Sequence, residues 1–181
     1  MSLRLSLFAS LSVLVAFSLP GAVAAKDKTV IAGTASVSDG DTLKFDGFRV
    51  GLWGIDAPER GQTCGKTDAG ALAENALRTL ANGKRTVCEV RDYDSKTKRP
   101  IATCTVDGED LAASLVEQGW AYPRNSQNAY GVEQSRAKAS MKGVNILSCD
   151  SPSKWRRDTE RAELKKKKKA DEKRKKLASR E

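Results

Sequence analysis

Short runs in which apolar and polar residues alternate mark several stretches of this chain as β-strands. The pattern predicts five strands, at residues 28–37, 42–45, 48–55, 85–91 and 101–106. The pair Asp46-Gly47 separates the second strand from the third and is typical of a tight hairpin turn. These two strands are therefore expected to lie antiparallel and side by side.

Apolar residues spaced three and four apart predict helices between and after these strands. The first helix begins after Thr67 or Asp68, either of which can cap it, and runs to about Ala81. A second begins after Asp110 and ends at Gly119, and a third covers about 132–141. Strands and helices mixed in this way within one short domain predict a small closed β-barrel decorated by helices, an α+β fold.

The first 25 residues have the layout of a secretory signal peptide. Arg4 precedes an apolar run from Leu5 to Leu19 that is shorter than a membrane span, and Ala24 and Ala25 offer small-residue cleavage sites. We therefore expect an exported protein, periplasmic or secreted, without a membrane span after cleavage. An uncleaved anchor is the alternative.

Positive charge is concentrated at the C-terminal end. Residues 154–181 hold 14 Lys and Arg against 6 Asp and Glu, a net +8, whereas residues 26–153 hold 17 of each and are neutral. This divides the chain into a signal peptide at 1–25, a domain at 26–153 and a Lys-rich tail at 154–181. With almost no apolar face, the tail is expected to be disordered or a solvated helix. It either serves only solubility or attracts polyanions and anionic surfaces.

The chain has four cysteines and no histidine. Disulfides fit an exported chain, and no pair has the Cys-x-x-Cys spacing of zinc sites. Cys88 and Cys104 are equidistant from the middle of the segment between two strands, so we pair them, and Cys64 with Cys149 follows by elimination. The missing histidine excludes Ser-His and Cys-His nucleophiles and histidine general bases.

Acidic residues gather at two neighbouring strand ends. Asp41 and Asp56 are nearly equidistant from the hairpin turn, so antiparallel pairing would set their carboxylates against each other. A hard divalent cation, Ca²⁺ or Mg²⁺, would relieve that repulsion. Asp39 is expected to lie just outside the direct ligands of this cation. Glu59 follows the stiff Pro58 and is placed to orient or deprotonate a water. The alternative for Asp39-Gly40-Asp41 is an ordinary turn.

The segments Val37–Thr42 (VSDGDT) and Leu52–Glu59 (LWGIDAPE) resemble the thermonuclease (staphylococcal-nuclease-like) family. Further similarity in Asp107–Leu111 and Leu115–Ala121 extends the resemblance over roughly residues 30–155. It implies a five-stranded OB-fold barrel with about three α-helices. It also implies a secreted, Ca²⁺-dependent nuclease that cuts DNA and RNA.

The resemblance also implies roles for individual residues. Asp41, Asp56 and the backbone carbonyl of Ala57 match the metal ligands, and Glu59 matches the residue that positions or activates water. Arg99 matches an arginine that clamps the scissile phosphate. These are the groups that phosphodiester hydrolysis requires: a positioned water, a cation and a forked donor for the added charge.

Two departures from the family pattern lie beside this site. Gly51 stands where the family has a second phosphate-contacting arginine, and one lost donor typically costs about a hundredfold to a thousandfold in rate. Arg49, on the same strand face, is a candidate substitute, with an ordinary surface residue as the alternative. Thr97 replaces a nucleotide-contacting tyrosine, while Lys96 and Lys98 keep positive charge near a phosphate.

Tyr122 and Tyr130 flank a loop that is expected to border a substrate groove. Taken together, the residues predict a monomeric, metal-dependent nuclease acting on DNA or RNA. Because of Gly51, the alternative is a catalytically weakened OB-fold module that binds nucleic acid or other polyanions. A third possibility is a surface-tethering role carried by the tail alone.

Overall fold

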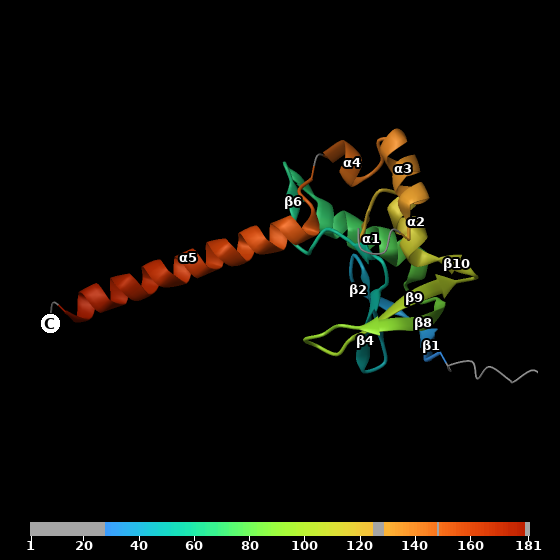
Figure 1. Ribbon diagram of the computed structural model, residues 1–181, viewed down its shortest axis with the longest axis horizontal. Helices are drawn as coiled ribbons and strands as arrows, with labels where there is room; N and C mark the ends of the chain where they lie inside the picture. The colour runs from blue at the N-terminus through green and yellow to red at the C-terminus, as the bar shows by residue number, and fades with distance from the viewer. Residues whose placement is uncertain (1–27, 125–128, 148, 180–181) are drawn as a thin grey trace, which may run out of the picture.

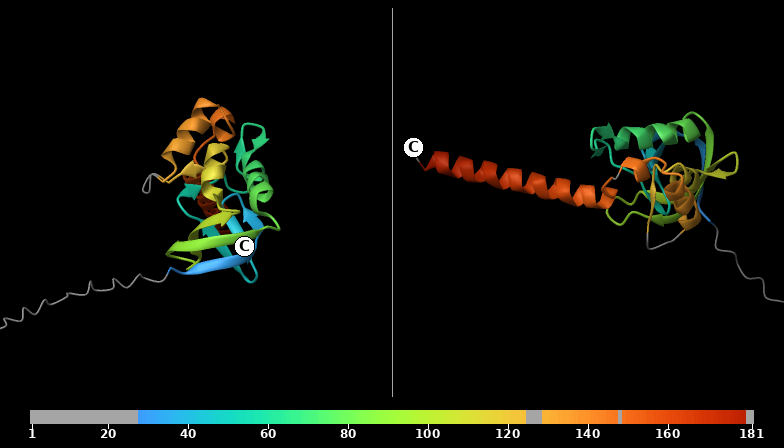
Figure 2. Two further views of the ribbon diagram at one scale, coloured as in Figure 1. Left: turned by 90° about the vertical axis from the view of Figure 1, so that its right-hand side faces the viewer. Right: turned by 90° about the horizontal axis from the view of Figure 1, so that it is seen from above.

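The structure is a computed structural model that describes residues 28–124, 129–147 and 149–179. A curled β-sheet forms the body, helices gather at one end of it, and one long helix leaves the body alone (Figures 1 and 2). The expected signal peptide at 1–25 lies outside the described residues. Within the described ranges, no helix has both the length and the apolar character that a membrane crossing requires.

The main sheet closes on itself. Its strands follow the order β1-β8-β9-β4-β3-β2, with β10 paired to β9. Their bounds are β1 Val30–Thr34, β2 Ser36–Asp39, β3 Thr42–Phe45, β4 Phe48–Leu52, β8 Arg85–Tyr93, β9 Pro100–Val106 and β10 Glu109–Asp110. Only Ala35 separates β1 from β2 along the chain, yet β1 is the first strand of this order and β2 is the last. One stretch of chain therefore closes the barrel, which confirms the predicted β-barrel with helices.

Ala35 bends this stretch, so the predicted single strand at 28–37 is two strands. Ala35 is buried and its N–H donates to the carbonyl of Lys84 at 3.1 Å rather than to a sheet neighbour. From this point β1 pairs with β8 and β2 pairs with β3. The change of partner is invisible in the alternating pattern, because both halves alternate alike.

Helix α1 (Ala69–Ala81) begins as predicted at Asp68, whose carboxylate accepts from the N–H of Ala71. Likewise α2 (Leu111–Glu117) is capped by Asp110. The other helices of the described residues are α3 Gly131–Ala139, α4 Val144–Leu147 and α5 Pro152–Ala178, against about three helices predicted. The segment before α1 contains β6 (Thr63–Cys64), which pairs with β7 (Thr67–Asp68).

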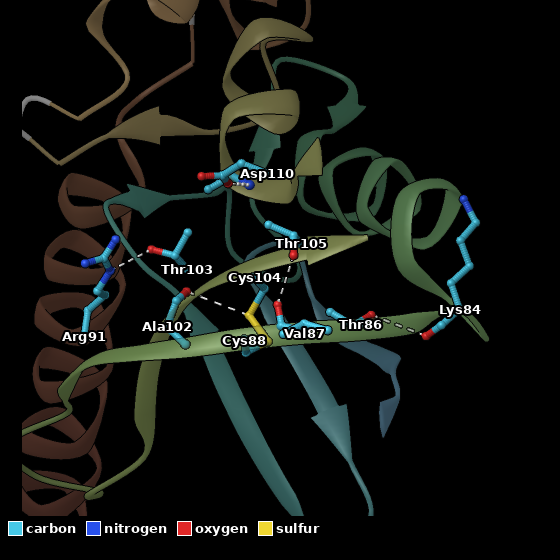
Figure 3. The surroundings of a disulfide bond; sticks show 11 residues. Lys84, Thr86, Val87, Cys88, Arg91, Ala102, Thr103, Cys104, Thr105 and Asp110 are labelled. Carbon is cyan, nitrogen blue, oxygen red and sulfur yellow. Dashed lines mark hydrogen bonds between the residues drawn. A yellow bond between two sulfur atoms is a disulfide. The ribbon is translucent and has the colours of Figure 1, made fainter. Parts of the chain in front are cut away.

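The disulfide Cys88–Cys104 lies inside the barrel, where the two residues face each other across β8 and β9. Figure 3 shows its surroundings, including the hydrogen bond from the hydroxyl of Thr105 to the carbonyl of Val87. The bond joins strands that already pair along most of their length, so it reinforces the wall of the barrel.

The disulfide Cys64–Cys149 joins segments that are distant in sequence, because it links the chain just before α5 to β6. Pro152 is buried at the first turn of α5, and the hydroxyl of Ser151 accepts from the N–H of Lys154. Beyond its first turns the helix is exposed along its length, as Figure 1 shows. The Lys-rich segment is thus helical, and its helix begins at Pro152.

Candidate active site

The two central carboxylates are brought together by a turn, rather than by direct pairing across a hairpin. Thr42 lies opposite Gly51, whereas Asp56 lies in β5 (Ile55–Asp56) opposite Tyr122 of β11 (Tyr122–Pro123). Gly54, with φ of +79°, turns the chain between β4 and β5. The expected face-to-face pairing of Asp41 with Asp56 was therefore wrong in its register, although the two residues are close enough to interact.

The proximity of Asp56 affects the pKa of Asp41. Burial is the main cause that raises the pKa of Asp41 above its ordinary value. The hydrogen bond from the Thr42 hydroxyl lowers this pKa, while the negative charges of Asp56, Asp39 and Glu59 raise it. Four carboxylates thus share one neighbourhood in which ionised Asp41 is disfavoured.

The Asp39-Gly40-Asp41 segment packs directly on helix α1. A Cβ at Gly40 would lie 3.0 Å from the Cβ of Ala73 and 3.1 Å from that of Ala57, so a larger residue would have to push these neighbours away by a few tenths of an ångström. Asp39 accepts a hydrogen bond from the Gly40 N–H at 2.9 Å. The segment is therefore a turn and a part of the acidic site at the same time.

Arg99 is linked to Asp41 through a threonine. Its Nη1 donates to the hydroxyl of Thr42 at 3.0 Å, and this hydroxyl donates to Oδ1 of Asp41 at 2.9 Å. The guanidinium lies over Gly51, where a Cβ would come within 3.3 Å of Nη2. The buried Nε–H of Arg99 has no acceptor among the described residues. The absent side chain at position 51 thus leaves the space that Arg99 fills.

Arg156 of α5 was not predicted from the sequence, yet it contacts the acidic site most closely. Its Nη1 and Nη2 donate to the two carboxylate oxygens of Asp56 at 3.0 and 2.9 Å, and Nη1 also contacts Oε1 of Glu59. The hydrogen bond to Asp56 is the main cause that raises the pKa of Arg156.

Gln62 holds the loop of Glu59 in place and was also missed. Its side-chain Oε1 accepts from the N–H of Glu59 at 3.0 Å, and its Nε2 donates to the carbonyl of Asp150 at 2.8 Å. Its own carbonyl accepts from the N–H groups of Ala69 and Gly70 at the start of α1. The side-chain amide and the backbone carbonyl of this one buried residue therefore join the Glu59 loop, α1 and the chain leading into α5.

The other predicted residues take varied positions. Arg49 is exposed on β4, opposite Lys44, and borders with Arg99 and Lys98 an open hollow of about 610 Å³. Lys96 is exposed in the loop between β8 and β9, which also contains Lys98. Arg49 thus lies on the outer side of Arg99, and the structure does not bring it to the acidic cluster.

The two tyrosines separate. Tyr122 is half-buried in β11, next to the strand of Asp56. Tyr130 is buried, donates to Oδ2 of Asp110 at 3.0 Å and packs edge-on against Trp53, so its hydroxyl is committed inside the fold. Burial and the charge of Asp110 raise the pKa of Tyr130. These contacts give Tyr130 a packing role in place of the expected border of a groove.

The oxygen-rich donor set fits a hard divalent cation in its chemistry. The side chains of Asp41 and Asp56, with the Ala57 carbonyl, would be its ligands. Arg156 now takes both oxygens of Asp56, and across the described ranges no three His, Cys, Asp or Glu side chains are grouped as a metal site. A cation on Asp56 therefore competes with Arg156 for this carboxylate.

Comparison with known proteins agrees with this picture. Residues 49–149 match the family model described as "Staphylococcal nuclease homologue"; this range includes Asp56, Glu59 and Arg99, and Asp41 lies before it. The succinoglycan biosynthesis protein ExoI of Rhizobium meliloti (strain 1021) is 37% identical over 127 residues. The alignment covers 63% of this chain and 64% of that relative, so the chain spans less than two thirds of the relative's length. The chain belongs to the staphylococcal nuclease homologue family, whose fold is an OB-fold barrel with helices.

Proposed function

We propose that this protein is a metal-dependent nuclease that hydrolyses phosphodiester bonds of DNA or RNA. The observation that carries the proposal is the line from Arg99 through Thr42 to Asp41, beside Asp56 and Glu59. It places a forked cationic donor next to a cluster of carboxylates. That combination suits a phosphodiester, whose extra negative charge must be stabilised as water attacks.

Each residue of the site has a task in this chemistry. Asp41, Asp56 and the carbonyl of Ala57 would hold the cation, Ca²⁺ in the first instance. A bound divalent cation supplies charge stabilisation at a non-bridging phosphate oxygen. Glu59 orients a water and accepts its proton, and Arg99 donates to the phosphate oxygens. Thr42 keeps Arg99 in position through its hydroxyl.

The direct test is cleavage of single-stranded DNA and RNA by the mature chain, residues 26–181, with Ca²⁺ and with a chelator. We expect cleavage only with the cation, and a loss of at least about a hundredfold in Glu59→Gln. The matched control is Glu109→Gln, which changes an exposed carboxylate of β10. Undiminished hydrolysis by Glu59→Gln would exclude the proposed site.

A second candidate function, binding of nucleic acid without efficient cleavage, is favoured by Gly51 and by the occupation of Asp56 by Arg156. Binding without cleavage at any Ca²⁺ concentration would select this alternative. The name of the relative ExoI speaks of succinoglycan biosynthesis. Nucleic acid as substrate therefore rests on the family and on the chemistry of the site.

The location and the tail complete the proposal. The leader pattern supports export to the periplasm or the medium, and we propose that the mature protein acts there as a monomer. The net charge of +8 in residues 154–181 supports attraction of polyanions to α5, nucleic acid above all. Detection of the mature N-terminus in an exported fraction would test the location.

A further inference from the structure

An open groove of about 500 Å³ lies beside Asp56, between β11, α3 and the start of α5. Its polar lining includes Asp56, Tyr122, Arg124, Gln134, Ser151 and Arg156. Two arginines, an amide and two kinds of hydroxyl therefore face one hollow next to the candidate active site. Such donors suit an oxyanion such as a phosphate.

Arg124 is held firmly at the edge of this groove. Its N–H donates to the carbonyl of Gly54 at 2.8 Å, and its Nε donates to the carbonyl of Ile55 at 3.1 Å. It also borders a small cavity of about 60 Å³ that Asp41 and Arg99 line. Arg124 thus borders both the groove and the cavity beside Arg99. Arg49 borders neither of them.

Arg156 borders the same groove while it binds Asp56 and Glu59. A guanidinium and a divalent cation on one carboxylate repel each other, so Arg156 and the cation compete for Asp56. The side chain of Arg156 is 42% exposed, so it has room to leave the carboxylates. The forked group is then available to an anion in the groove that it already borders.

We propose that this groove binds a phosphate of the nucleic-acid strand next to the one that is cleaved, through Arg124 and Arg156. Arg156 alternates between two partners: the carboxylates of Asp56 and Glu59 when no cation is bound, and the strand phosphate when a cation takes the carboxylates. Charge is balanced in both arrangements. The pair thereby adds two cationic contacts to the strand beside the cleaved phosphate. This inference rests on the proposed function for the identity of the strand.

Two binding titrations of the full mature chain, with both disulfides intact, test the proposal. The first is a calorimetric titration with CaCl₂ alone. The second measures fluorescence anisotropy of a labelled hexathymidylate with phosphorothioate linkages, which resist hydrolysis, in saturating CaCl₂, where the cation holds the carboxylates and Arg156 is released to the strand. The variants are Arg156→Gln and Arg124→Gln, with Arg136→Gln as the control of equal charge change, because Arg136 is exposed on α3 and pairs with Glu117.

One substitution should act in opposite directions on the two ligands. Arg156→Gln should bind Ca²⁺ about tenfold more tightly and hexathymidylate about tenfold more weakly, the change expected for one charged hydrogen-bonded contact. Arg124→Gln should leave Ca²⁺ binding unchanged and weaken hexathymidylate binding similarly. Each should lower the salt slope of strand binding by about 0.7. Arg136→Gln should change neither affinity by more than about twofold.

The opposite results would overturn the proposal. Weaker or undetectable Ca²⁺ binding by Arg156→Gln would mean that Arg156 only holds the carboxylates in place. Unchanged hexathymidylate affinity in both groove variants would exclude the groove as a phosphate site. Equal losses with hexaglutamate would show plain charge attraction. Neither titration measures cleavage, so an inactive wild type would refute the proposed nuclease and leave this inference open to its own test.

Discussion

Gln62 shows how much a single buried residue can decide at the site. Its side chain bonds the N–H of Glu59 and the carbonyl of Asp150, and only 1% of its surface is exposed. Gln62→Met keeps the approximate size and removes both hydrogen bonds. We expect a loss of about 1–3 kcal/mol in the free energy of unfolding, because two partly buried hydrogen bonds, each worth about 0.5–1.5 kcal/mol, are removed. Urea unfolding measures it.

The matched control is Gln118→Met, because Gln118 is exposed at the end of α2. It should change stability by less than about 0.5 kcal/mol. Similar stabilities of the two variants would show that the Gln62 bonds contribute little.

Asp41 gives a prediction of the opposite sign. Since the folded state raises the pKa of Asp41, ionisation of this carboxyl costs stability, and the wild type loses stability as pH rises past the ordinary carboxyl pKa. Asp41→Asn in chelator at neutral pH should raise Tm by about 2–4 °C, the shift that about 1 kcal/mol gives in a chain of this size. Thermal unfolding with Asp46→Asn, an exposed turn residue, as control measures the effect; a lower Tm would contradict it.

At this scale the sequence predicts what is local. Asp41, Asp56, Glu59 and Arg99 stand in short motifs, and the structure brings them into one region. Arg156 contacts Asp56 from 100 positions away. Nothing in an exposed, basic stretch distinguishes this arginine from its neighbours, because its role depends on where α5 leaves the barrel.

At the scale of elements, the first turn of α1 packs against the backbone of Glu59 and so fixes the position of its loop. A Cβ at Gly70 would overlap the carbonyl oxygen of Glu59, so the first turn of α1 accepts only glycine there. Alanine in a helix normally stabilises by about 1 kcal/mol relative to glycine. Gly70→Ala should instead destabilise by about 1–3 kcal/mol, as overpacking does, and lower cleavage by shifting Glu59.

Asn75→Ala on the exposed face of α1 is the control, because it should gain a few tenths of a kcal/mol. Denaturant unfolding of both variants makes the comparison. A gain in stability from Gly70→Ala would mean that the Glu59 loop yields easily.

The alternating pattern was sufficient for the strands and their approximate bounds, and capping residues were sufficient for α1 and α2. It failed where chain direction changes inside an apolar run, at Ala35 and at Gly54. The first run continues to alternate through the bend at Ala35, so burial alone does not mark that bend, and around Gly54 the residues on both sides are buried or half-buried. The short pair β6 and β7 was missed for a related reason, since two-residue strands have no period.

At the scale of the whole molecule, a neutral barrel carries a positively charged helix. The 27 residues of α5 extend about 40 Å, and no described element covers its outer turns (Figure 2). Replacing Lys165 to Lys169 with Gln should weaken binding of long single strands and lower the salt slope by about 0.7 for each lysine that contacts a phosphate.

Cleavage of a substrate too short to reach the outer turns should be unchanged by these five replacements. The reference is a variant with Lys84, Lys138 and Lys142, exposed on the barrel and near α3, changed to Gln. Anisotropy titrations at several salt concentrations separate the two. Equal slopes in wild type and the α5 variant would exclude the helix as a strand-binding surface.

The lone helix also makes the protein easy to trim. Arg157, Arg161 and the lysine run of α5 are exposed, and like charges three and four apart weaken that part of the helix. A trypsin-like protease should therefore shorten the chain in steps and slow down near Pro152, where burial and the Cys64–Cys149 bond protect the backbone. Such trimming would thus yield two forms of the protein, with the same candidate active site and unequal reach along a strand.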